Sequence, residues 1–325
     1  MPVTNTFVFT SDELRPYTLG DWDNRSAVRS KNSTFLLPPD AEIRLQLQTK
    51  NWFPQAFIPY FNDNTIQTSG EHIQHRLAAN HLVYFLRYTT ILEHKIVNRS
   101  VETLIHEELG VELPQTMKLT ALQLYTDEGY HALFSFKLSE QVAHFYDMPT
   151  WEAPPKRITL LLELMDATMD AHRPLTWFFF GFVSETIIAK ELLSITGDTL
   201  ISTVYQMFRE HLEDEARHSR YFSEVFRYLW PKLSLAQQEY SASLLVKIIF
   251  IFAEVDEPWL SASLSGVDIP LLEVNKIVQA LQTLDVRTQR ARSIAMGTIQ
   301  AMTRAGFFEL QTHRKLFSQS GLIDA

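Results

Sequence analysis

The stretch HLEDEARHSRYF, residues 211–222, decides how this chain is interpreted. Because an α-helix turns by about 100° per residue, the side chains of His211, Glu215 and His218 fall on one face and converge beside the helix. The stretch also contains Glu-x-x-His, in which a carboxylate and an imidazole lie one turn apart. Both groups are ligands that iron, manganese and zinc accept. The stretch therefore predicts a helix that carries metal ligands.

A second Glu-x-x-His motif, formed by Glu128 and His131, lies upstream in a similar Asp-Glu-x-x-His context. At this content of Glu and His roughly one such motif is expected by chance, so the two motifs alone are weak support for a metal site. A lone glutamate on an otherwise apolar helix precedes each motif, Glu93 in FLRYTTILEH and Glu185 in FFGFVSETIIA. A glutamate in such surroundings is costly unless it is paired or bound to a metal. The joint order therefore favours a metal site.

Each of these four elements falls on its own predicted helix, over residues 70–108, 115–146, 174–197 and 199–230. Two helices with a Glu each and two with Glu-x-x-His are typical of ferritin-like di-iron and di-manganese proteins. We therefore expect an all-α fold, a long ferritin-like four-helix bundle surrounded by additional helices.

Outside the bundle the sequence predicts an N-terminal arm, accessory helices and one continuous domain over residues 1–325. The arm, residues 1–65, is rich in Pro, Asn, Asp and Thr and should contain few regular elements. Pro154 and Pro155 should open a short helix that ends near residue 171. The bundle then occupies residues 70–230, and accessory helices fill residues 234–325. Ser234 should cap the first of them, to about residue 255, and others should run from about Pro270 to Gly306 and beyond.

Composition excludes several classes of function. The chain has 325 residues, a formal net charge of -9 and no cysteine, which rules out thiolate catalysis, iron–sulfur clusters and disulfides. No basic segment is concentrated enough to suggest a nucleic-acid partner. The most apolar runs, Leu175–Val183 and Leu244–Phe252, are too short for a bilayer crossing, which needs about 20 apolar residues. With no signal-peptide pattern at the N-terminus, we expect a soluble cytoplasmic protein without a membrane partner.

The candidate ligands are four carboxylates and three imidazoles, enough for two metal ions. Taken singly, each could be an ordinary surface or paired residue, and only their order favours a metal role. Asp127 and Asp214 precede the two motif glutamates, and each is placed to accept the free N–H of a metal-bound histidine across the bundle. The candidate metal ligands are Glu93, Glu128, His131, Glu185, His211, Glu215 and His218.

Two further residues indicate where a cavity could lie. Gly181 is about one turn from Glu185, and Tyr125 is about one turn from Glu128. A glycine removes bulk and would leave room for dioxygen or substrate. The alternative is plain helix–helix packing, and the sequence does not decide between the two.

The full ligand pattern resembles that of the di-iron N-oxygenases typified by p-aminobenzoate N-oxygenase (AurF type), over roughly residues 70–225. His211, a seventh ligand one turn before Glu215, distinguishes this pattern from ferritin-like oxidases with six. The resemblance implies that all seven residues bind two iron ions, although these ligand types also suit manganese. It implies that dioxygen is a co-substrate. A peroxo-diferric species would oxidise an amine to a hydroxylamine, and in some members on to nitroso and nitro products, in secondary-metabolite biosynthesis. His211 would be the catalytic residue that tunes this chemistry.

The resemblance also implies partners. The substrate would be a small-molecule or carrier-tethered amine, and a homodimer is plausible. No Gly-x-Gly-x-x-Gly motif for flavin or nicotinamide occurs, so electrons should come from a separate ferredoxin or reductase. Four late arginines could hold a substrate carboxylate, but a solvated or salt-bridged helix face is the commoner role of such a cluster. They are Arg287, Arg290, Arg292 and Arg304.

Three other interpretations stay open from the sequence. A different ferritin-like oxidase or hydroxylase would share six of the ligands, and would leave His211 pointing to solvent. A non-catalytic helical binding protein would hold no metal. A zinc hydrolase is less favoured, because zinc sites use fewer ligands and keep an open position for water.

Overall fold

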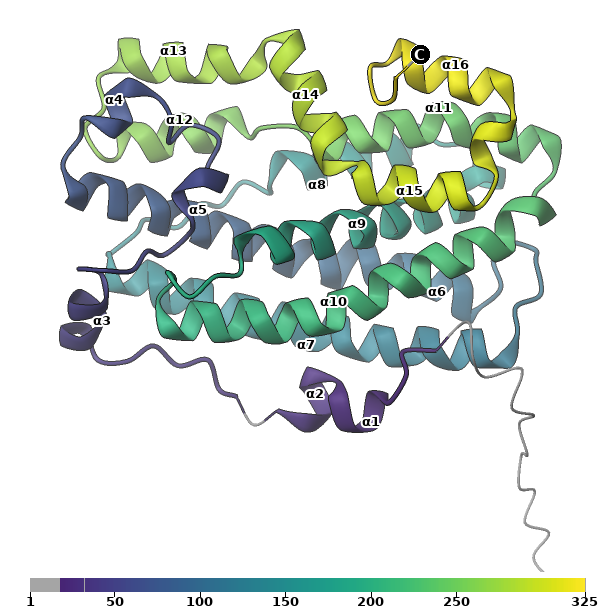
Figure 1. Ribbon diagram of the computed structural model, residues 1–325, viewed down its shortest axis with the longest axis horizontal. Helices are drawn as coiled ribbons and strands as arrows, with labels where there is room; N and C mark the ends of the chain where they lie inside the picture. Colours follow the sequence, from purple (N-terminus) through teal and green to yellow (C-terminus); the bar gives the residue numbers. More distant parts are fainter. Residues whose placement is uncertain (1–17, 32, 325) are drawn as a thin grey trace, which may run out of the picture.

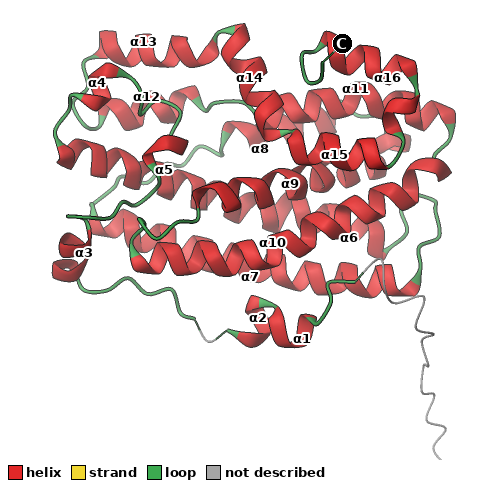
Figure 2. Ribbon diagram, viewed as in Figure 1, coloured by secondary structure: helices red, strands yellow, loops and turns green. Residues whose placement is uncertain are grey.

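The computed structural model describes residues 18–31 and 33–324 of the chain. These residues form helices joined by short loops (Figure 2), and among them the one extended pairing is an isolated bridge between Asn51 and Leu200. The predicted all-α fold is therefore confirmed. None of the helices in the described part combines the length and apolar character that a bilayer crossing requires.

Four long helical segments form the bundle (Figure 1). The first is a continuous helix built from α5, a π-helical turn and α6, and it packs against the second, α7. The third and fourth, α9 and α10, pack against each other, and α6 contacts both α7 and α9. Their bounds are α5 Glu71–Ile91, the π turn Leu92–Val97, α6 Asn98–Ile105, α7 Gln115–Phe145, α9 Arg173–Ile195 and α10 Ser202–Leu229. The four predicted helices agree with these bounds to within a few residues.

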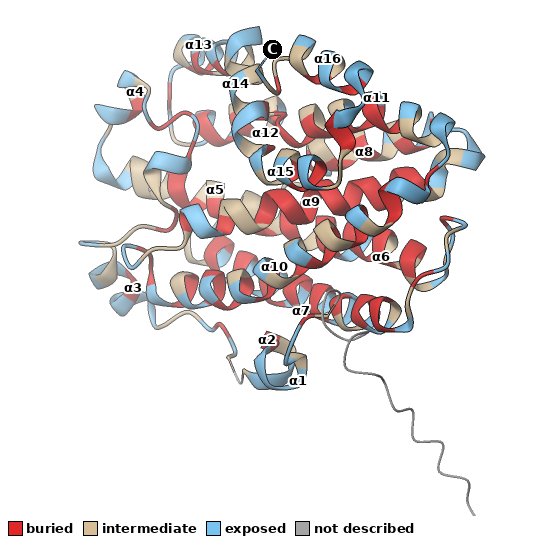
Figure 3. Ribbon diagram, turned by 45° about the vertical axis from the view of Figure 1, so that its right-hand side comes forward, coloured by how far each residue is buried: buried red, intermediate tan, exposed pale blue. Residues whose placement is uncertain are grey.

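Two apolar clusters fill the bundle, one toward each end. On α10 one cluster ends at Phe208 and the other begins at Tyr221. On α7 one cluster ends at Leu124 and the other begins at Phe134. Figure 3 shows that α9 is buried along most of its length, whereas α7 and α10 also carry exposed residues. The polar residues of α7 and α10 lie in the layer between the two clusters, so the apolar packing on either side holds that layer dry.

The N-terminal arm carries more regular structure than expected, although each element is short. Residues 1–17 lie outside the described part of the chain. The two helices that follow, α1 and α2, lie along the edge of the bundle beside α7 and α10 (Figure 1). The arm elements are α1 Trp22–Arg25, α2 Ala27–Ser30, α3 Asp40–Gln46, a 3-10 turn Gln55–Phe57 and α4 Asn64–Gln67.

The remaining helices cover the opposite side of the bundle, where α11 and α15 pack against α9 (Figure 1). Ser234 caps α11 with a reciprocal capping box, as predicted. Helix α12 was not predicted, although Asp256 as its cap and Pro258 in its first turn are ordinary start signals. The elements are α8 Lys156–Asp166, a 3-10 turn Asp170–His172, α11 Leu235–Phe252, α12 Glu257–Ser265, α13 Leu271–Gln282, α14 Leu284–Ile294, α15 Met296–Arg304 and α16 Gln311–Gln319.

Candidate metal centre

The first predicted ligand, Glu93, lies on the π-helical turn Leu92–Val97. A π turn contains one residue more than an α turn and is frequent at functional sites. Glu93 is buried in the bundle with 2% of its surface exposed. Sequence reasoning predicted an uninterrupted α-helix here, and neither Gly nor Pro marks the irregularity.

The structure brings all seven predicted ligands into one layer between the four helices. Helix α7 supplies Glu128 and His131, α9 supplies Glu185, and α10 supplies the remaining three. Each of the seven residues is at most 2% exposed. His211 points inward with them, which is the orientation that separates the seven-ligand pattern from the six-ligand one.

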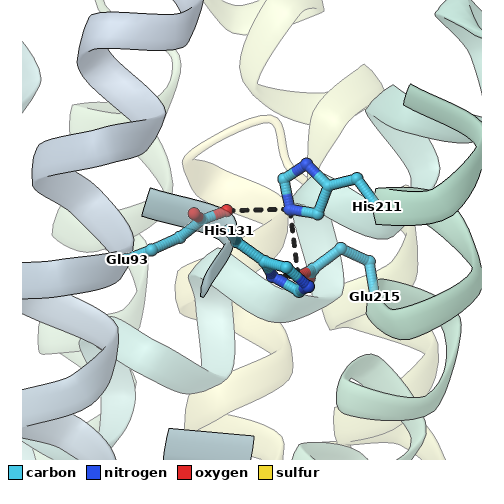
Figure 4. A group of neighbouring side chains, drawn as sticks. All are labelled: Glu93, His131, His211 and Glu215. Carbon is cyan, nitrogen blue, oxygen red and sulfur yellow. Dashed lines mark ion pairs between the residues drawn. The ribbon is translucent and has the colours of Figure 1, made fainter. Parts of the chain in front are cut away.

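One group of four residues surrounds a first candidate metal position (Figure 4). His211 Nε2 lies 2.8 Å from Glu93 Oε1 and 3.3 Å from Glu215 Oε1. His131 Nδ1 lies 3.2 Å from the same oxygen of Glu215. One ligand atom from each of these four side chains lies within 4.8 Å of the others, a spacing that suits a single ion.

A second group of four surrounds an adjacent position. This group consists of Glu128, His131, Glu215 and His218. His218 Nδ1 lies 2.8 Å from Glu128 Oε1 and 3.3 Å from Glu215 Oε1. Glu185 lies just outside the group of four, with its Oε2 3.7 Å from the same nitrogen. Glu215 and His131 belong to both groups. A carboxylate can bridge two ions whereas an imidazole binds one, so Glu215 is the candidate bridge between the two positions.

The ligand atoms of these seven side chains suit metal ions, because nearly all of them lack a hydrogen-bond partner among the described residues. Although the unpartnered atoms approach one another to 2.8–3.9 Å, none of them makes a hydrogen bond of acceptable geometry with any residue in the described part of the chain. A buried polar group without a partner costs about 1–3 kcal/mol, and a native cluster of them calls for a specific explanation. The unpartnered atoms are both oxygens of Glu93, Glu128 and Glu215, Oε2 of Glu185, Nδ1 of His131 and His218, and Nε2 of His211.

Without metal, the same cluster must hold protons. Burial raises the pKa of Glu128 to about 7 and raises the pKa of Glu185 well above its ordinary value. Burial disfavours the charged imidazoles too, but the surrounding carboxylates outweigh it, so the pKa values of His131 and His218 lie well above their usual range. Burial also opposes ionisation of Glu215, yet the neighbouring imidazoles, His218 foremost, hold its pKa well below 4.5.

Two aspartates outside the cluster orient its histidines. Asp127 Oδ2 lies 3.1 Å from His218 Nε2, and Asp214 Oδ2 lies 3.1 Å from His131 Nε2. Asp127 of α7 thus contacts a histidine of α10, and Asp214 of α10 contacts a histidine of α7, as the sequence suggested. When Nε2–H is donated to the aspartate, the lone pair of Nδ1 faces the candidate metal position.

The N-terminal arm reaches these aspartates, which sequence reasoning missed. Trp22 Nε1 donates to Asp127 Oδ2 at 2.9 Å, and Ser26 Oγ donates to Asp127 Oδ1 at 2.6 Å. The backbone N–H of Ala27 donates to Asp214 Oδ2 at 3.1 Å. The donors lie at least 101 residues from their acceptors along the chain, and no local motif signals such contacts.

The two predicted cavity residues have other roles. A Cβ added to Gly181 would lie 2.3 Å from Ser100 Oγ and 3.0 Å from Phe222, so this glycine permits the close approach of α6 and α9. Tyr125 is 39% exposed, and it lines a surface hollow. The prediction that both residues line an interior cavity beside the ligands is therefore wrong, because one is packed against a neighbouring helix and the other faces outward.

A cavity of about 280 Å³ lies instead against the helices that carry Glu93 and Glu185. Its walls are mostly apolar, among them Phe85 of α5 and Ile187 of α9. Three cations face it, Arg157, Lys190 and Arg290, against a single carboxylate, Glu191.

Arg290 is the one late arginine among the residues that line this cavity. Its Nη2 is buried without a hydrogen-bond partner, while Nε donates to Ala253 O at 2.5 Å. Two of the other late arginines form ion pairs instead, Arg287 with Glu254 and Arg292 with Asp324. Sequence reasoning gave no particular weight to Arg290 and did not predict a substrate role for Arg157 or Lys190.

Comparison with known proteins gives the same family as the ligand pattern. No curated protein matches the chain. The model of the family described as P-aminobenzoate N-oxygenase AurF matches residues 18–306, a span that contains all seven candidate ligands and both aspartates. The match also extends over the arm helices and α15, well beyond the four-helix bundle. The chain therefore belongs to the p-aminobenzoate N-oxygenase AurF family.

Proposed function

We propose that this protein is a dioxygen-dependent N-oxygenase that oxidises an amine with two iron ions. The observation that carries the proposal is the buried layer in which four carboxylates and three imidazoles from four helices leave their ligand atoms without hydrogen bonds. Membership of the AurF family supports the choice of iron and of amine oxidation. Manganese has the same ligand preferences and is the alternative metal.

The proposed first step converts an amine, dioxygen, two electrons and two protons into a hydroxylamine and water. When bound, the two iron ions would supply the activation of dioxygen that this step requires. Because the sequence contains no dinucleotide-binding glycine motif, a separate ferredoxin or reductase would deliver the electrons. Repetition of the step on the same nitrogen would lead on to nitroso and nitro products.

The protein's own residues would hold and shape this centre. Glu215, shared by both groups, would bridge the two ions, and His131 and His218 would each bind through Nδ1. His211 would add a third neutral nitrogen at the position it shares with Glu93. Its inward orientation is the specific observation that favours an N-oxygenase over a six-ligand oxidase.

The substrate would occupy the 280 Å³ cavity beside α5 and α9. That volume exceeds the roughly 150 Å³ of an engineered cavity that binds benzene, so a single aromatic ring with small substituents fits. The guanidinium of Arg290, whose Nη2 has no partner among the described residues, would donate hydrogen bonds to a carboxylate of the substrate, with Arg157 and Lys190 adding positive charge. An amine of the aminobenzoate type, on which the family acts, meets these requirements.

The test is a single-turnover reaction of the iron-loaded protein. Metal-free protein is loaded with two equivalents of Fe(II) without oxygen, exposed to ¹⁸O₂, and mixed with p-aminobenzoate, aniline and an aliphatic amine. We expect hydroxylamino, nitroso or nitro products that carry ¹⁸O on nitrogen, with p-aminobenzoate the best substrate. Hydroxylation at carbon would instead indicate another ferritin-like oxidase, and failure to retain any metal would indicate a non-catalytic protein. A parallel Mn(II) loading separates the two metals.

A further inference from the structure

The N-terminal arm closes over the outer side of the metal centre. Three of its residues, Trp22, Ser26 and Ala27, contact the two aspartates that hold the histidines, and we call these three residues the clasp. Ser26 is fully buried and Ala27 is 1% exposed, although both belong to a short surface segment. Trp22 places its indole N–H between the two oxygens of Asp127, at 3.0 and 2.9 Å.

The clasp divides its contacts between the two halves of the centre. Trp22 and Ser26 donate to Asp127, which holds His218. Ala27 donates to Asp214, which holds His131 and also contacts Arg217 of its own helix. The arm is thus the main source of donors for Asp127, whereas Asp214 has a second donor within the bundle.

We propose that the clasp is a positioning device, which fixes Asp127 and Asp214 and through them directs Nδ1 of His218 and His131 at the two metal positions. The proposal rests on the proposed function only in that the centre binds metal. Because an aspartate held by the clasp orients its histidine, docking of the arm raises metal affinity. By linkage, bound metal must then favour docking of the arm by the same factor.

The first variant removes the arm's donors to one aspartate alone. Trp22→Phe together with Ser26→Ala deletes every clasp hydrogen bond to Asp127 and leaves the bond from Ala27 to Asp214 in place. Co(II) titration of the metal-free protein should show about a tenfold loss of affinity at the His218 position, the range for partners of metal-bound histidines. Affinity at the other position should stay within a factor of about two. Asn24→Ala, which changes an exposed residue of the same segment, is the matched control and should alter neither affinity.

The second variant acts on the other aspartate. Ala27→Pro removes the backbone N–H that reaches Asp214. The backbone conformation suits the change, because Ala27 is the first residue of α2 and Ser26 has φ -64° and ψ 141°, a conformation that suits a residue before proline. The proline ring then takes the place of the N–H that faces Asp214. In this variant the loss of Co(II) affinity should occur at the His131 position. Equal losses at both positions for both variants would show that the arm has only a general structural role, and would overturn the proposal.

The reciprocal effect has a readout that does not involve activity. Trypsin cleaves after Arg25 and Arg29, which are both exposed and lie close to the clasp residues in the sequence. Metal loading should slow this cleavage by about fivefold or more in the wild-type protein, and by less in the Trp22→Phe, Ser26→Ala variant. Cleavage that is equally fast with and without bound metal in the wild-type protein would contradict the coupling.

Failure of the inference is distinguishable from failure of the proposed function. If the wild-type protein binds no metal, the proposed function fails with it. If the wild-type protein binds two ions and the clasp variants bind them equally well, only the inference fails. Should the double variant not fold, Ser26→Ala alone deletes the 2.6 Å bond to Asp127, and the same selective loss at the His218 position is required of it.

Discussion

Two sets of buried carboxylates lie within one layer of this bundle, and they are satisfied in opposite ways. The four glutamates and the two aspartates are all at most 2% exposed. Each oxygen of Asp127 and Asp214 accepts at least one hydrogen bond, from the clasp, from Arg217 or from a histidine. Of the eight glutamate oxygens, seven accept no hydrogen bond from residues 18–31 and 33–324. A buried carboxylate needs compensation, so the aspartates are complete without metal while the glutamates require cations.

The ionisation of the two sets follows the same division. Burial raises the pKa values of Asp214 and Glu128 alike, but hydrogen bonds and the nearby His131 reverse the effect for Asp214, whose pKa is lowered. For Glu128, burial and the charge of Glu215 outweigh the opposing effect of His218 and His131, and the pKa rises to about 7. We therefore expect the aspartates to form a permanent frame and the glutamates to form a site that would exchange protons for metal.

The largest effect should come from the glutamate shared by both metal positions. Glu215→Gln keeps the size of the side chain but removes the charge that two ions would share. We expect metal affinity to fall by more than about 100-fold, beyond the range for residues that act through a ligand. Metal content after gel filtration and turnover of the loaded protein are the measurements. Two ions retained by this variant would show that Glu215 is not a bridge.

The outer aspartates should have a smaller effect. Asp127→Asn and Asp214→Asn keep the shape of the side chain but weaken the acceptor that holds the histidine. Metal affinity should fall by about 10- to 100-fold in each variant, with two ions still bound at saturation. Glu213→Gln is the control, since Glu213 is exposed on the same helix and pairs with Lys31 at 3.4 Å. An effect as large as that of Glu215→Gln would remove the distinction between the two sets.

The distinction between the two sets was only partly visible in the sequence. That the seven candidate ligands lie together was predictable because helical spacing fixes which residues share a face. The pairs Glu128 with His131 and Glu215 with His218 need no tertiary information. The pairing of Asp127 with His218 was predictable for a similar reason, since each aspartate precedes a motif glutamate. The bundle itself followed from long apolar helices with ordinary start and stop signals.

What the sequence could not supply depends on contacts between distant segments. The π turn at Glu93 has no local marker, because tertiary packing rather than propensity selects it. The clasp joins Ser26 to Asp127 across 101 residues, and nothing in either segment specifies the other. Gly181 illustrates the same limit, since a glycine that opens a cavity and one that admits Ser100 look identical in a sequence.

The pH dependence of metal binding should expose the proton exchange at the inner set. Metal needs Glu128 ionised and His131 and His218 neutral, while the raised pKa values favour the protonated forms of all three. Metal affinity should therefore rise with pH, by about tenfold per unit for each proton displaced.

The stability of the metal-free protein should change in the other direction. A folded-state pKa above the unfolded value contributes stability at low pH, and that contribution is lost as pH rises through the folded pKa. For Glu128 the loss runs from its ordinary 4.5 to about 7, and for the two histidines it lies above 6.5. The lowered pKa values of Glu215 and Asp214 have the opposite effect on stability, but only at pH values below the ordinary pKa of each group. Thermal midpoints of metal-free and loaded protein should diverge as pH rises, and a constant gap would contradict the proton exchange.

A change in the cavity should have the smallest effect on metal binding, because the cavity is lined by neither the four glutamates nor the two aspartates. Arg290→Gln removes the unpartnered Nη2 that would bind a substrate carboxylate. Loss of one charge-assisted hydrogen bond, about 1.5–3 kcal/mol, should raise KM for p-aminobenzoate by at least about tenfold. Metal affinity and KM for aniline, which lacks the carboxylate, should not change. Arg292→Gln is the control, because Arg292 does not line this cavity and its Nη2 pairs with Asp324 Oδ1 at a distance of 2.5 Å. An equal rise in KM for both amines would mean that Arg290 shapes the cavity without recognising the carboxylate, and the substrate class would then have to be sought among amines without an acidic group.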